Sequence, residues 1–76
     1  LLERAKAHPQ GLRFRDFEAL LKSCNWVYKR QSGSHRLWAS PTGFRMPIQD
    51  LKGMAKAYQV RQFLKQHEYE VKHGSK

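Results

Sequence analysis

The sequence predicts an α+β fold in one domain, residues 1–76: a helix, a three-stranded antiparallel meander and a longer helix, with a short extra helix in front. Two observations predict it. The length of 76 residues predicts a single domain, and apolar residues first recur every three or four positions, then alternate, and finally return to helical spacing. A chain this short buries only about 60% of the surface that its unfolded form exposes, so its core is small. Any site is therefore expected on an open face or completed by a partner.

The N-terminal part of the chain is predicted to be helical. Residues 1–11 are expected to form an extension, with a short helix over residues 1–8 that Pro9 ends. The next helix is predicted over about residues 15–23, with Asn25 as its C-terminal cap. Its apolar face consists of Phe17, Leu20, Leu21 and Cys24.

Strand-forming residues then alternate, which predicts strands over residues 26–31, 34–40 and 44–48. A two-residue turn at Ser32–Gly33 joins the first two, because its glycine can adopt a positive φ. Pro47 cannot donate a ladder hydrogen bond, so the third strand is expected to lie at an edge of the sheet or to end there.

Helical spacing returns in the last third of the chain. Residues 50–53 are predicted to form a connection, followed by a helix whose apolar face includes Ala57, Val60, Phe63 and Leu64. Residues 73–76 are expected to form a frayed tail. The helices would then cover one face of the sheet and leave the other face open.

Side-chain alternation indicates which residues lie on that open face. Trp38 is the largest apolar residue of the second strand, so its side is assigned to the core, although Leu37 favours the opposite assignment. His35 is then expected on the open face, together with Lys29 and Arg45. The same alternation assigns the bulky residues of the outer strands to the core: Trp26, Tyr28, Phe44, Met46 and Ile48.

The net charge of +9, from 15 Lys and Arg against 6 Asp and Glu, predicts affinity for polyanions. Each neutralised phosphate releases a condensed counterion, so RNA is the first candidate, and an acidic protein that masks the basic surface is another. An anionic membrane would also attract the chain, but no apolar run approaches the roughly 20 residues of a membrane span. We therefore expect no membrane partner.

The cysteine and histidine content bounds the possible cofactors. A single cysteine, Cys24, excludes an internal disulfide and a multi-cysteine zinc site, and fits a reducing, cytoplasmic setting. The histidines other than His35 show no metal-ligand spacing. No metal and no small-molecule cofactor are expected.

His35 has the side chain best suited to proton transfer near neutral pH. Gly33 and Ser34 next to it would let an RNA backbone approach closely, and their N–H groups could meet phosphate oxygens. The alternative is that His35 only caps the hairpin. Similarly, Trp26 and Trp38 could stack RNA bases, but core packing is the stronger prediction in so small a domain.

The segment Arg30-Gln31-Ser32-Gly33-Ser34-His35-Arg36, following an amphipathic helix and Asn25-Trp26-Val27, resembles the HicA-family toxins of bacterial type II toxin–antitoxin systems. Tyr58–Lys65 is similar to the last helix of that family, and the resemblance covers roughly residues 13–68. Ser32 stands where the family commonly has Lys, and Asn25 replaces the usual Gly.

The resemblance implies a fold like that of double-stranded-RNA-binding domains, in the order α-β-β-β-α. It also implies messenger-RNA cleavage (an mRNA interferase activity) through His35, and neutralisation by a HicB-type antitoxin. We hypothesise metal-independent cleavage, in which His35 takes the proton of a ribose 2′-hydroxyl while Lys29, Arg36 or Arg45 offsets the charge on the phosphoryl oxygens. The residues expected to bind RNA are Lys29, Arg30, Gly33, Ser34, Arg36, Arg45 and Lys52. The alternative is a non-catalytic module on the same fold that binds RNA or the antitoxin.

Overall fold

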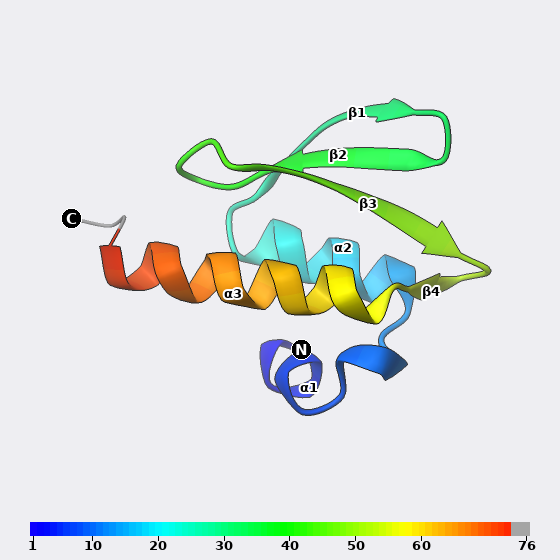
Figure 1. The fold of residues 1–76 in the computed structure, drawn as a ribbon, viewed down its shortest axis with the longest axis horizontal. Helices are drawn as coiled ribbons and strands as arrows, with labels where there is room; N and C mark the ends of the chain where they lie inside the picture. The colour runs from blue at the N-terminus through cyan, green and yellow to red at the C-terminus, as the bar shows by residue number, and fades with distance from the viewer. Residues whose placement is uncertain (74–76) are drawn as a thin grey trace.

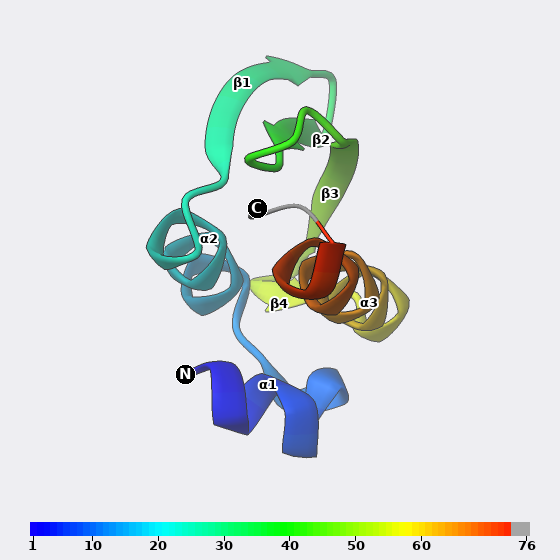
Figure 2. The same cartoon turned by 90° about the vertical axis from the view of Figure 1, so that its left-hand side faces the viewer.

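A mixed helix–sheet architecture in three layers is seen in the computed structural model, which describes residues 1–73 (Figures 1 and 2). The elements in chain order are α1 (Leu2–Ala7), the 3₁₀ turn η1 (Pro9–Gly11), α2 (Phe14–Ser23), β1 (Val27–Ser32), β2 (His35–Ala39), β3 (Arg45–Leu51), β4 (Met54–Ala55) and α3 (Ala57–His73). The antiparallel sheet has the order β1-β2-β3-β4. Helices α2 and α3 lie side by side under the sheet, and α1 lies beneath them (Figure 2). The α+β class is confirmed, with four strands where three were predicted.

Helix α2 ends in the cap that was predicted at Asn25. This residue has a φ of 69° and donates its N–H to the carbonyl of Lys22 at 3.0 Å, while the N–H of Trp26 bonds to the carbonyl of Leu21 at 3.0 Å. Paired bonds of this kind define a Schellman motif, and Asn is one of the few non-glycine residues that tolerate its left-handed position. The cap turns the chain so that Trp26 is buried at the entrance to the sheet.

The β1–β2 hairpin differs from the prediction in two details. Its turn residues are Gly33 and Ser34, with Ser32 and His35 as the closing pair, so the turn lies one residue later than expected. A β-bulge also interrupts β1 between Tyr28 and Arg30, which leaves Lys29 without a partner in the ladder. A bulge adds one residue to a strand and shifts the alternation of everything beyond it.

The predicted connection over residues 50–53 is wrong, because it forms a second hairpin. Strand β3 continues to Leu51, and a tight turn at Lys52 and Gly53, with φ values of 51° and 89°, leads into β4. Positive φ at both central residues matches the twist of a two-residue hairpin. The side chain of Asp50 holds this turn by accepting the N–H of Gly53 at 2.6 Å.

Pro47 does not end β3, but it lies at an edge as predicted, because β4 pairs only with Asp50 and Leu51. The side-chain amide of Gln59 in α3 donates to the carbonyl of Pro47 at 3.3 Å and accepts the N–H of Gln49 at 3.0 Å. This buried amide thus takes the place of a neighbouring strand next to a residue that cannot donate.

The core lies between the sheet and the two long helices. Trp38, Met46 and Ile48 face it from the sheet, as predicted, while Tyr28 is 38% exposed. The fully buried side chains of largest volume are Phe17, Phe63, Leu12, Leu20, Leu21, Met46, Ile48 and Val60. At the C-terminus His73 belongs to α3 rather than to a tail, and the rest of the predicted tail lies outside the described residues.

Candidate nucleic-acid interface

His35 is the first residue of β2 and lies exposed on the face of the sheet opposite the helices. Its Cα partners are Ser32 on β1 and Gln49 on β3, whereas the next residue, Arg36, pairs with the buried Ile48. Directly opposed residues share a face and successive residues alternate, so His35 points away from the core. The β1–β2 turn beside it and the β3–β4 turn lie at the same end of the molecule (Figure 1).

A shallow hollow of about 290 Å³ lies around His35 and is lined by Arg30, Ser32, Leu37 and Pro47. Three strands contribute to it, and Leu37 pairs with both Arg30 and Pro47. The hollow has an apolar floor, a hydroxyl, an imidazole and a guanidinium, all on an open surface. A sugar or a splayed base can lie on such a floor while the cation meets a phosphate.

Hydrogen bonds of Gln49 and Lys56 stabilise the turn beside His35, and neither residue was predicted from the sequence. The Gln49 amide donates to the Ser34 hydroxyl at 2.8 Å, and the Lys56 ammonium donates to the same amide's oxygen. The Gln31 amide donates to the carbonyl of Gly33 at 3.1 Å. Alternation would have placed Gln49 on the face of Arg45 and Pro47, but the third strand was predicted to end at residue 48.

The predicted cations lie at different distances from His35. Lys29 was predicted on the open face with His35, but the bulge falls at Lys29, and Arg30 is the residue of β1 that pairs with Leu37 on that face. Arg45 pairs with Ala39, four residues from His35 along β2, or about 13 Å at the usual strand rise. Lys52 is exposed in the β3–β4 turn at the end of the sheet where His35 lies.

Arg36 lies on the opposite face from His35, so the structure does not bring the two together. Its guanidinium pairs with Glu18 of α2 and stacks 4.3 Å from the centroid of the Tyr28 ring. The hydrogen bond that Arg36 donates to Glu18 raises the pKa of Arg36, and this effect outweighs the partial burial of the guanidinium. The same carboxylate accepts the indole N–H of Trp38 at 3.0 Å. Arg36 therefore joins the sheet to α2.

Within residues 1–73, no group of three or more His, Cys, Asp or Glu side chains could hold a metal ion. None of the helices in that range is both long enough and apolar enough to cross a membrane.

A family model described as "HicA toxin of bacterial toxin-antitoxin" matches residues 14–69. The matched segment begins with α2 and ends inside α3, so it contains the whole sheet and excludes α1 and η1. No curated protein and no solved structure matches the chain.

Proposed function

This chain belongs to the HicA family of bacterial toxin–antitoxin toxins, and from that premise we propose that it is an endoribonuclease that cleaves messenger RNA at His35 without a metal ion. The observation that carries the proposal is the position of His35. An imidazole that is exposed on an open sheet face, in a hollow with a guanidinium, can reach a ribose and its phosphate together.

The proposed reaction is attack of a ribose 2′-oxygen on the adjacent phosphate. His35 accepts the 2′-hydroxyl proton, the bond between phosphorus and the 5′-oxygen breaks, and the leaving oxygen takes up a proton from the imidazolium or from water. The products are a 2′,3′-cyclic phosphate and a 5′-hydroxyl. Arg30 lies in the same hollow and would offset charge on the phosphoryl oxygens.

The rest of the proposed RNA site consists of backbone N–H groups and cations. Gly33 and Ser34 would present their N–H groups to a phosphate beside the scissile one. Lys29 and Lys52 would bind phosphates near this end of the sheet, and Arg45 one farther along β2. Arg36 is left out of the reaction, because it lies on the other face and is paired with Glu18.

The family implies an antitoxin as the protein partner. We propose that this is a HicB-type antitoxin whose acidic surface covers the basic sheet face, and that both act in the cytoplasm, where messenger RNA is found. The charge of +9 supports a partner of opposite sign.

The test compares purified wild type with His35→Ala on a single-stranded RNA oligonucleotide and on its 2′-O-methyl analogue. We expect His35→Ala to bind RNA normally and to cleave about 10²–10⁴-fold more slowly, the usual contribution of a general base. The methylated RNA should be bound but not cut, and a cyclic phosphate should appear among the wild-type products.

The matched control is His8→Ala, which removes an exposed histidine from the far side of the helical layer. It should cleave like the wild type. Cleavage by His35→Ala at the wild-type rate would refute the mechanism. RNA binding without any cleavage by the wild type would instead favour a non-catalytic binding module.

A further inference from the structure

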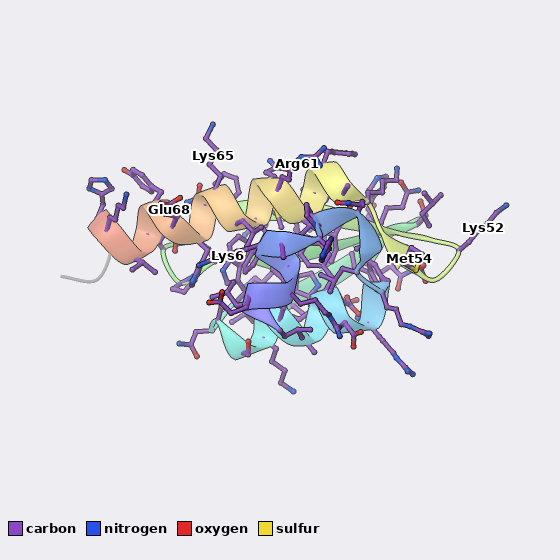
Figure 3. All side chains as sticks on the ribbon, turned by 90° about the horizontal axis from the view of Figure 1, so that it is seen from below. Lys6, Lys52, Met54, Arg61, Lys65 and Glu68 are labelled. Atoms are coloured by element: carbon purple, nitrogen blue, oxygen red, sulfur yellow. The ribbon has the colours of Figure 1, made fainter. Side chains whose placement is uncertain are left out.

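A groove of about 600 Å³ lies between α1 and α3. The side of α3 that faces α1 is turned away from most of the sheet (Figure 2). Lys6 of α1 lines the groove together with residues of α3 between Arg61 and Lys72. Figure 3 shows this side from below, with Lys6, Arg61 and Lys65 labelled. We call it the α1–α3 groove.

The rim of the α1–α3 groove is positively charged. Lys6, Arg61 and Lys65 are exposed, and none of them takes part in an ion pair with another residue in the range 1–73. Glu68, the carboxylate that lines the groove, pairs with Lys72 at 3.4 Å. Lys6, Arg61 and Lys65 are therefore available to pair with the negative charges of a ligand.

The floor of the groove is apolar. Leu64 packs partly against the core, and Val71, which is 60% exposed, lies two helical turns farther along the same face of α3. A sugar-phosphate backbone has no side chains to bury on such a floor, whereas an amphipathic peptide does. The combination of cations and exposed aliphatic residues therefore favours a protein segment over a nucleic acid.

The groove depends on a part of the chain that the family match does not include. Residues 14–69 match the family, while Lys6 and the rest of α1 lie before them. The short helix is anchored by the fully buried Ala5, so its outer face is held in place beside α3. One wall of the groove, formed by α1, thus lies outside the matched segment, while most of the wall formed by α3 lies inside it.

We propose that the α1–α3 groove binds an acidic amphipathic segment of a partner protein. Carboxylates of the segment would pair with Lys6, Arg61 and Lys65, while its apolar side chains cover Leu64 and Val71. This proposal does not depend on RNA cleavage, because the groove and His35 lie on opposite sides of the helical layer.

The experiment uses the full chain and a fluorescent synthetic peptide of about 15 residues, long enough to form a helix, with Leu on one face and Glu flanking it. A scrambled peptide of the same composition keeps the charge but loses the amphipathic pattern. Fluorescence anisotropy should show that the patterned peptide binds more tightly. Lys65→Glu should weaken its binding about threefold to tenfold, as expected for reversal of an exposed charge.

Two matched controls separate the groove from the general charge of the chain. Lys22→Glu makes the same charge change on α2, outside the groove, and should leave peptide binding within twofold of wild type. Val71→Ser should weaken binding without any charge change, whereas Val27→Ser, an equally exposed position on β1, should not.

Equal binding of the two peptides, or equal losses in Lys65→Glu and Lys22→Glu, would overturn the proposal. It would also be overturned if Lys65→Glu weakened single-stranded RNA binding but left the peptide unaffected. His35→Ala should bind the peptide like wild type, so a failure of the cleavage mechanism and a failure of the groove proposal give different results.

Discussion

Arg30 lies beside His35 because the turn at Gly33 and Ser34 pairs Ser32 with His35 and Arg30 with Leu37. The bulge at Lys29 follows on the other side of Arg30 and returns Tyr28 to the core face, opposite Trp38. An arginine at this position matters chemically, because a guanidinium can make two parallel hydrogen bonds to a phosphate, whereas an ammonium acts as a point charge.

Arg30→Gln should therefore weaken RNA binding and change its salt dependence. Removing one phosphate contact is expected to reduce the slope of log K against log salt by about 0.7 for a single strand. The measurement is a salt titration of RNA binding by anisotropy. Arg4→Gln, which removes an exposed arginine from α1, is the control and should keep the wild-type slope. An unchanged slope in Arg30→Gln would mean that this side chain contacts no phosphate.

The sequence predicted the face of His35 correctly because Trp38, three residues later, is too large to leave exposed. It could not predict which cation of β1 lies beside Leu37, since Lys29, Arg30 and Gln31 are all polar and their pattern does not mark a bulge. Gln49 and Lys56 were missed for a different reason. Their roles depend on contacts between segments that are distant in the chain.

At the scale of elements, the nearly buried carboxylate of Glu70 links α3 to the β2–β3 turn through hydrogen bonds. Glu70 accepts hydrogen bonds from the hydroxyls of Ser40 at 2.6 Å and Thr42 at 2.8 Å, and from the amide of Gln66 at 2.7 Å. Burial opposes ionisation of Glu70, but these hydrogen bonds together outweigh it and lower the pKa of the carboxyl.

Because the pKa of Glu70 is lowered in the folded state, the protein is expected to lose stability as the pH falls. A carboxyl with a depressed folded pKa stabilises the fold above its unfolded pKa, about 4.3 for Glu, and this contribution is lost as the pH falls through the folded pKa. Glu70→Gln should lower the free energy of unfolding at pH 7 by about 1–3 kcal/mol, the usual effect on hydrogen bonds to a charged group.

Urea unfolding at neutral and acidic pH measures this effect. The loss of stability on acidification should be smaller in Glu70→Gln than in wild type. Glu68→Gln is the control, because Glu68 is exposed and its surface pair with Lys72 contributes little. The assignment to Glu70 is wrong if both variants show the wild-type pH dependence.

The long elements were predictable and the short ones were not. Helices α2 and α3 and the first hairpin have repeated apolar spacing or a glycine at the turn, and both signals are local. Strand β4 has only two residues, Met54 and Ala55, too few to show alternation. It exists because it pairs with β3 and bonds to Leu12, a partner far away in the chain.

At the scale of the whole molecule, a charge of +9 on 76 residues repels itself. Raising the salt concentration from about 50 mM to about 200 mM should therefore increase the melting temperature while it weakens RNA binding. Calorimetry and anisotropy on the same samples check both directions. A melting temperature that falls as salt is added would show that ion pairs such as Arg36–Glu18 outweigh the repulsion.

The bulge in β1 also affects the tendency of the protein to aggregate. β1 is an edge strand, and its outer backbone groups could pair with the same strand of another copy. A bulge twists an edge and breaks its regular spacing, and charged side chains at Lys29 and Arg30 repel a second copy. The bulge therefore lets Tyr28 stay opposite Trp38 while Arg30 stays at the hollow, and it also disfavours aggregation through the edge strand β1.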